Sequence, residues 1–241
     1  RQASLPGIAG AHPLMPEKLS QGMLALMYNM ERYLAEITGL EAVTLQPAAG
    51  AHGELTGMLV FYAHHAAHGN PRSKILIPDT AHGTNPASAT LCGYASIPVP
   101  SGEDGIIDPK TVEALMDDDT AGIMVTNPNT LGLFENNIKE IARIVHAKGG
   151  LVYADGANMN AVMGVVNMES IGVDVLHLNL HKTFSTPHGG GGPGAGPVCV
   201  TKELERYLPV PRVVKDGDLY RLDYTPSTAI SASWSGLIVI S

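Results

Sequence analysis

The stretch "HLNLHKTFSTPHGGGGPGAGPVCV" (177–200) places a lysine between an apolar run and a burst of glycines. We interpret 174–180 as a buried strand, so that Lys182 follows a strand end directly. Lysine is rarely buried without a role, and burial favours the neutral amine, which is a nucleophile. The alternative is a lysine whose stem lies on the rim while its ammonium reaches solvent. The glycines pack nothing and cost backbone entropy, so they need a separate reason.

Outward from this stretch, strand-like and helical segments alternate along the chain. Apolar, β-branched runs predict strands, and apolar residues at helical spacing predict helices. Alternation of this kind is typical of an α/β fold with a mostly parallel, helix-covered sheet, whose ligands collect beyond the carboxyl ends of the strands. The expected strands are 42–46, 74–78, 95–99, 121–127, 150–155, 174–180 and 196–201, and the expected helices are 17–38, 53–68, 108–116 and 135–147.

Composition narrows the class of protein. The chain has 241 residues, 44% of them hydrophobic, and a formal net charge of -8, with no basic cluster of the kind that binds nucleic acid. No apolar run has membrane-spanning length, and two distant cysteines fit a reducing, cytoplasmic setting. The chain begins without methionine and ends on "SGLIVIS", so we expect it to be a piece of a longer protein.

Several predicted strands end in polar groups or glycine turns. "AAGAHGE" (48–54) leads from a strand into a helix, where Gly50 and Gly53 let backbone N–H groups approach an anion. The alternative is an ordinary turn, and the pattern is neither of the common nucleotide loops. Asp155 ends another apolar strand, where a buried carboxylate needs a partner, although a helix-capping aspartate is an equal alternative.

Histidines and methionines offer weaker candidates. His82 could stack on a flat ligand, but a satisfied core histidine is more common. His64 and His68 have the spacing of zinc ligands without an obvious third ligand, so we expect a solvated helix face and no metal. The Met23, Met27 and Met30 stripe is expected in the core.

An amine, an acid and an anion cradle at one sheet edge suit pyridoxal phosphate (PLP). Its aldehyde needs a lysine, its pyridine nitrogen a carboxylate, and its phosphate a helix N-terminus. Lys182, Asp155 and the Gly50 turn are the respective candidates.

Four motifs together closely resemble the glycine decarboxylase P-protein family of the glycine cleavage system, in the PLP-binding second subunit of its split bacterial form. The resemblance runs from about His12 to Arg212 and is weak after about Val213. The motifs are "LQPAAGAHGE" (45–54), "DTAHGTNPASA" (79–89), "YADGANMNAV" (153–162) and "LNLHKTFSTPHGGGGPG" (178–194).

The resemblance implies the PLP-dependent fold type I (aspartate-aminotransferase-like), with a mostly parallel seven-stranded sheet. It implies that Lys182 carries PLP and that Asp155 pairs with the pyridinium nitrogen. Further implied contacts are His82 and Ala157 on the two ring faces, Asn127 near the phenolic oxygen, Gly50, Ala51 and His52 around the phosphate, and His181 close to it. Thr84 and Asn85 are candidates for the substrate side.

The implied reaction is oxidative decarboxylation of glycine, with transfer of the aminomethyl group to the lipoyl arm of H-protein and release of CO₂. A homologous first subunit and a homo- or hetero-oligomer are the implied partners, and the glycine-rich loop would give the lipoyl arm access. The expected organisation is an N-terminal helical segment (1–40), a PLP-binding large domain (41–212) and the start of a truncated C-terminal region (213–241). Another fold type I enzyme, such as a decarboxylase or desulfurase, and a catalytically incompetent structural subunit remain the alternatives.

Overall fold

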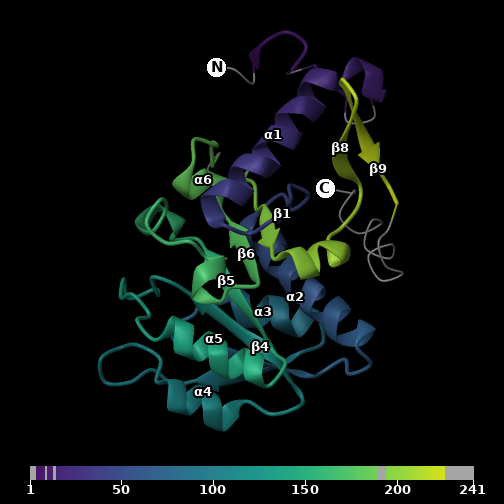
Figure 1. Ribbon diagram of the computed structural model, residues 1–241. Helices are drawn as coiled ribbons and strands as arrows, with labels where there is room; N and C mark the ends of the chain where they lie inside the picture. The colour runs from purple at the N-terminus through teal and green to yellow at the C-terminus, as the bar shows by residue number, and fades with distance from the viewer. Residues whose placement is uncertain (1–3, 9, 13–14, 189–193, 226–241) are drawn as a thin grey trace.

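The computed structural model describes residues 4–8, 10–12, 15–188 and 194–225. Strands and helices alternate through most of this part, as the sequence pattern predicts (Figure 1). The strands are β1 (Ala42–Thr44), β2 (Lys74–Pro78), β3 (Ala95–Val99), β4 (Thr120–Thr126), β5 (Leu151–Gly156), β6 (Val175–Leu178), β7 (Val198–Val200), β8 (Arg212–Asp216) and β9 (Leu219–Asp223). The α-helices are α1 (Gln21–Thr38), α2 (Gly50–Ala67), α3 (Thr84–Leu91), α4 (Pro109–Leu115), α5 (Ile138–Ala147) and α6 (Leu180–Thr183).

Seven strands form one sheet in the order β1-β7-β6-β5-β4-β2-β3. The pairs from β3 across to β6 are parallel, and β7 runs antiparallel to both β6 and β1. The predicted mostly parallel seven-stranded sheet is therefore confirmed. Because β4, β5 and β6 are parallel neighbours, their carboxyl ends lie at one edge of the sheet.

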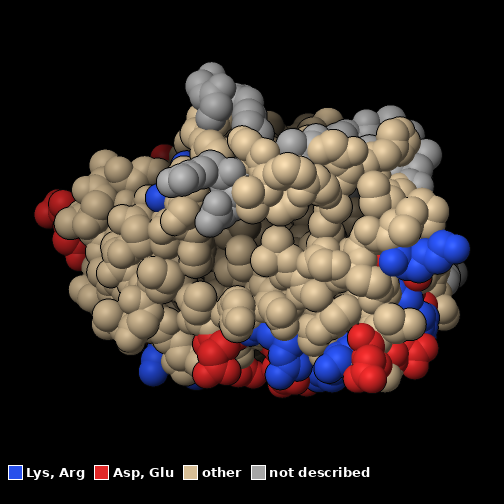
Figure 2. All heavy atoms as spheres, turned by 90° about the horizontal axis from the view of Figure 1, so that it is seen from above, with Lys and Arg blue, Asp and Glu red and all other residues tan. Residues whose placement is uncertain are grey.

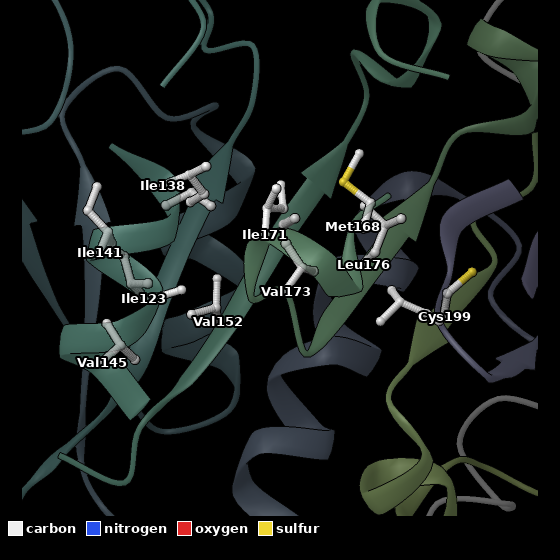
Figure 3. Packing of buried hydrophobic residues seen from close by; sticks show 14 of the residues in the cluster. Ile123, Ile138, Ile141, Val145, Val152, Met168, Ile171, Val173, Leu176 and Cys199 are labelled. Carbon is white, nitrogen blue, oxygen red and sulfur yellow. The ribbon is translucent and has the colours of Figure 1, made fainter. Parts of the chain in front are cut away.

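Side chains alternate between two hydrophobic clusters, one on each face of the sheet. In β5, Val152 and Ala154 join one cluster and Tyr153 joins the other, as the two-residue period of a strand requires. Figure 3 shows the first cluster, in which side chains of α5 face those of the central strands. Burial on both faces explains why β4, β5 and β6 are almost wholly apolar.

Local signals set several helix ends. The Asp108 side chain accepts a hydrogen bond from the Lys110 N–H at 3.0 Å and caps α4, as predicted. Gly39 ends α1 with φ of 80°, a left-handed conformation that favours glycine. Helix α3 was not among the predicted helices, because Gly83 and Pro86 mark its sequence as a loop.

The two ends of the described chain pack against each other. The Gln21 side chain donates to the Tyr220 carbonyl at 2.6 Å and accepts from the Tyr220 N–H at 2.8 Å, which joins α1 to the β8–β9 hairpin. The expectation that the methionine stripe lies in the core is wrong for Met27, which is 38% exposed on α1 near the exposed Leu26. In the view from above, few charged side chains lie in the middle of the surface, and most gather at its margins (Figure 2).

No helix in the described part of the chain combines the length and the hydropathy that a membrane span requires.

Candidate active site

A cavity of about 480 Å³ lies at the carboxyl edge of β4, β5 and β6. Its walls come from the N-terminus of α2, the segment that enters α3, the residues after β4 and β5, and α6. This volume is within the usual range for sites that hold a cofactor or small ligand. The lining residues are Gly50, Ala51, Glu54, His82, Thr84, Thr126, Thr130, Asp155, Ala157, Asn158, His177, Asn179, His181, Lys182 and His188.

The N-terminus of α2 opens onto this cavity. The first intrahelical bond runs from the Gly53 N–H to the Ala49 carbonyl at 3.0 Å, and the preceding N–H groups lack such a partner. Gly50 and Ala51 line the cavity, whereas the side chain of His52 is exposed and does not. The helix end therefore suits a phosphate group through its backbone rather than through His52.

Two glycines allow the start of α2 to pack closely, Gly50 against a side chain and Gly196 against the backbone. A Cβ atom on Gly50 would lie 2.2 Å from Asn179 Nδ2, and one on Gly196 would lie 2.0 Å from the Ala49 carbonyl oxygen. The last glycine of the predicted glycine-rich loop is thus needed to seat the end of α2. Residues 189–193 make up most of the glycine-rich segment that is predicted to admit the lipoyl arm, and they lie outside the described residues.

Lys182 lies in the short helix α6 and lines the cavity together with Asp155. Lys182 is exposed, so of the two interpretations left open by the sequence the structure shows the rim position rather than the buried amine. The strand ends at Leu178, and Asn179 and Leu180 turn the chain into α6 before the lysine. This turn presents the Lys182 amine to the cavity opening rather than to the core.

Asp155 lies in β5 and is 4% exposed. Its carboxylate accepts hydrogen bonds from the Ala157 N–H at 2.9 Å and from Asn85 Nδ2 at 3.3 Å. His177 Nε2 lies 3.4 Å from the Asp155 Oδ1 atom. Asn85, predicted on the substrate side, is instead buried behind this carboxylate, while Ala157 lines the cavity as predicted.

His82 stands at the mouth of the cavity and is held by a chain of polar contacts. His82 Nδ1 lies 2.7 Å from Thr84 Oγ1, and the Thr84 hydroxyl lies 2.7 Å from Glu54 Oε1. The Ser88 hydroxyl donates to Glu54 Oε2 at 3.2 Å. The buried Glu54 carboxylate therefore anchors Thr84, and Thr84 anchors the imidazole.

Asn127 does not line the cavity, although Thr126 beside it does. Asn127 Oδ1 accepts from the Glu135 N–H at 3.0 Å, and its Nδ2 is buried without a partner in the described residues. The Thr126 hydroxyl is likewise buried and unpaired. Thr126 lines the cavity, so its unpaired hydroxyl fits an oxygen-bearing cofactor there, whereas Asn127 Nδ2 does not face the cavity.

His181 and His188 form the remaining wall. Their rings meet edge to face at 4.9 Å, and the Ala195 N–H donates to His181 Nδ1 at 3.4 Å. Partial burial, with His188 and Lys182 nearby, lowers the pKa of His181. The lining of the cavity thus combines the basic side chains of His181, Lys182 and His188 with the carboxylates of Glu54 and Asp155.

Sequence reasoning missed Glu54, His177, Asn179 and His188 as site residues. His177 and Asn179 were detectable, because polar residues alternate there with leucines in a strand buried on both faces. Glu54, Asp155 and His177 are also the one group within the described residues whose ligand atoms lie within 4.8 Å of one another, as a metal site would need. Each of the three already has hydrogen-bonding or close polar partners.

The sheet order and this cavity define the large domain of a fold type I enzyme, and its residues fit PLP, the cofactor of that fold. The chain belongs to the aminotransferase class-V family, whose model matches residues 56–210.

Among curated relatives, the chain is 57% identical over 223 residues to the probable glycine dehydrogenase (decarboxylating) subunit 2 of Halalkalibacterium halodurans, covering 92% of this chain and 46% of the relative. It is 56% identical, with the same coverage, to the protein of that name from Caldanaerobacter subterraneus. The chain therefore spans about half the length of these relatives.

Solved structures show the same fold. An inhibitor-bound glycine decarboxylase (P-protein) of the glycine cleavage system superposes with a TM-score of 0.78 at 20% identity, covering 99% of this chain and 57% of that one. An aspartate aminotransferase from Thermus thermophilus gives 0.58 at 14% identity, covering 76% of this chain and 51% of that one. The predictions of fold type I and of PLP as the cofactor are confirmed.

Proposed function

We propose that this chain carries the PLP site of a glycine decarboxylase that transfers the aminomethyl group of glycine to the lipoyl arm of H-protein and releases CO₂. The names of relatives that are 56–57% identical to the chain support this activity and substrate. The structural observation that carries the proposal is the single cavity around which Lys182, Asp155 and the N-terminus of α2 gather.

When bound, PLP withdraws electrons from the α-carbon of an attached amino acid, which lets a carboxylate leave as CO₂. Lys182 would hold the aldehyde of the cofactor, and Asp155 would keep the proton on its ring nitrogen. The N–H groups at the start of α2 would bind its phosphate. Because Lys182 is exposed, a small amine from solvent could reach the cofactor aldehyde that this lysine would hold.

Glu54, Thr84 and His82 would act together at the mouth of the cavity. The Glu54 carboxylate fixes Thr84, which limits the positions of the His82 ring beside the cofactor. The unpaired Thr126 hydroxyl would be satisfied by a polar atom of the cofactor, and a contact of Asn127 with the phenolic oxygen would require its side chain to turn toward the cavity. These roles for His82 and Asn127 remain predictions, as do the phosphate contacts of Ala51 and the contact of His181.

The proposal includes partners, namely lipoylated H-protein and a homologous first subunit in a homo- or hetero-oligomer. Exposed apolar side chains follow β4 and β5 in the chain, close to cavity residues Thr130 and Asn158, and suit contact with another protein. These side chains are Leu131, Leu133, Phe134, Met163 and Val165. A cytoplasmic setting remains a prediction.

The test is exchange of labelled bicarbonate into the carboxyl group of glycine by the whole protein with PLP and lipoylated H-protein. We expect exchange with glycine but not with L-alanine or L-cysteine, and none without H-protein or with the Lys182→Ala variant. A PLP-loaded protein that releases CO₂ or sulfide from another amino acid would replace glycine decarboxylation by one of the alternative reactions. A loaded protein inactive with every amino acid would indicate a structural subunit.

A further inference from the structure

Behind the cavity, Tyr153 of β5 and His177 of β6 form a buried polar pair. Tyr153 is 0% exposed and His177 is 1% exposed, and their rings stack at 5.9 Å. The Tyr153 hydroxyl lies 2.5 Å from His177 Nδ1. On its other side, His177 Nε2 lies 3.1 Å from Asn179 Oδ1 and 3.4 Å from Asp155 Oδ1.

The sites for hydrogen atoms in this pair follow from counting donors and acceptors. In the described residues, His177 Nδ1 is the one hydrogen-bond partner of the Tyr153 hydroxyl. If this hydroxyl accepted from Nδ1, its own proton would be buried without an acceptor, which is costly. Tyr153 therefore donates, Nδ1 accepts, and the imidazole carries its proton on Nε2, facing the oxygens of Asn179 and Asp155.

Three glycines of α2 hold the two rings in this arrangement. Gly50, Gly53 and Gly57 follow helical spacing and face the sheet without side chains. A Cβ atom on Gly53 would lie 2.9 Å from His177 Cβ, and one on Gly57 would lie 2.6 Å from the Tyr153 ring. The helix thus packs directly on the pair and leaves neither ring room to turn away.

We propose that Tyr153 is a positioning residue that keeps His177 neutral, so that the His177 Nε2–H supports the Asp155 carboxylate without neutralising its charge. The functional part of this inference rests on the proposed function, in which Asp155 faces the cofactor. A charged His177 would form an ion pair with Asp155 and compete with the cofactor for its charge. The Tyr153 hydroxyl prevents this by occupying the second ring nitrogen.

The surroundings show why a donor to Nδ1 is needed. The ionisable groups around His177 are Asp155 and Tyr153 on β5, Glu54 on α2 and His181 on α6. The Asp155 and Glu54 carboxylates are both buried, and each has an oxygen within 4.8 Å of a ring nitrogen of His177. Burial, with Asp155 and Glu54 nearby, also raises the pKa of Tyr153 well above its usual value, so its hydroxyl keeps the proton that it donates.

The test compares the whole protein with its Tyr153→Phe variant by NMR of ¹⁵N-labelled histidine, with the His177 signals assigned from a His177→Asn variant. A matched control is Tyr94→Phe, because the Tyr94 hydroxyl is also buried but has no hydrogen-bond partner in the described residues. We expect wild type and Tyr94→Phe to show His177 as one neutral tautomer, protonated on Nε2, between about pH 6 and 8. Tyr153→Phe should show a protonated imidazole in the same range, and its glycine–bicarbonate exchange should fall at least about tenfold.

The inference is overturned if wild-type His177 is protonated on Nδ1 or on both nitrogens, and also if Tyr153→Phe leaves its state unchanged. Because the wild-type spectrum can overturn the inference by itself, the inference stays falsifiable even if the variant does not fold. The NMR readout does not require cofactor chemistry. If the tautomer is as stated but wild type never binds PLP, the proposed function fails while the assignment of the pair stands.

Discussion

Replacement of Gly196 by alanine should disturb the site through the backbone alone. The added Cβ would lie 2.0 Å from the Ala49 oxygen and 2.5 Å from its carbonyl carbon, whereas real Cβ atoms essentially never approach within 3.0 Å. One of the two segments must therefore move by about 1 Å, since 3.0 − 2.0 = 1.0. Neither contact atom belongs to a flexible side chain, so the cost should lie at the upper end of overpacking penalties, about 3 kcal/mol.

For a chain of this size, about 3 kcal/mol corresponds to a melting temperature roughly 6–12 °C lower. Because the contact atoms belong to the start of α2, the strain should reach the N–H groups that would bind phosphate, and the affinity for PLP should also fall, by at least about tenfold. Differential scanning calorimetry and PLP titration would measure the two effects. The matched control is Gly22→Ala in α1, where an added Cβ would have no atom within 4 Å outside its own helix and chain neighbours. Alanine there should stabilise the helix by about 0.5–1 kcal/mol. A Gly196→Ala variant that melts and binds PLP like wild type would refute the close-packing argument.

Three other changes test separate parts of the site and fold. Asp155→Asn should still bind PLP but lose about 4 kcal/mol of transition-state stabilisation, a roughly thousandfold lower exchange rate, and near-normal turnover would disprove its role. Glu54→Gln should lower the free energy of unfolding by about 1–3 kcal/mol in denaturant titrations and should weaken PLP binding. The control is Glu135→Gln, at another buried carboxylate, which should destabilise the protein without changing its affinity for PLP. Equal PLP affinities of the two variants would contradict the anchoring of His82 by Glu54. His146 Nε2 lies 2.7 Å from Asp174 Oδ2, and this contact raises the pKa of His146. The pair therefore stabilises the folded state fully below the ordinary histidine pKa of about 6.5, and this stabilisation is lost as pH rises through the raised pKa of the folded state. His146→Gln should therefore be less stable than wild type at pH 6, by under about 1 kcal/mol because the pair is partly exposed. The difference in unfolding free energy should disappear by about pH 9, and a difference that grows with pH would contradict the raised pKa of His146.

The sequence predicted the sheet well because its strands are buried on both faces and read as continuous apolar runs. It predicted Asp155 for the same reason, since a carboxylate that ends such a run is conspicuous. It failed at α3, where Gly83 and Pro86 argue for a loop while burial of Asn85 and Ala89 against the sheet favours a helix. Packing outweighed local propensity at that point.

The site was predicted less completely than the sheet. Lys182 was expected directly after a strand end, with a buried amine and a rim position both left open. The turn at Asn179 places the lysine on an open wall, and this turn follows from contacts distant in sequence. Glu54 carries no local signal, because its partners Thr84 and Ser88 lie about thirty residues later in α3. Asn127 shows the same limit, since its unpaired Nδ2 becomes visible only when the surrounding residues are placed.

The most direct test of the central claim is to reduce the PLP-loaded protein with borohydride and map the pyridoxyl group by peptide mass spectrometry. The account predicts the pyridoxyl group on Lys182. It also predicts that glycine changes the absorbance of PLP in wild type but not in the Lys182→Ala variant. Lys202, which follows β7 at the opposite edge of the sheet and does not line the cavity, should remain unlabelled. A pyridoxyl group on any lysine other than Lys182 would contradict the site described here and the reaction proposed for it.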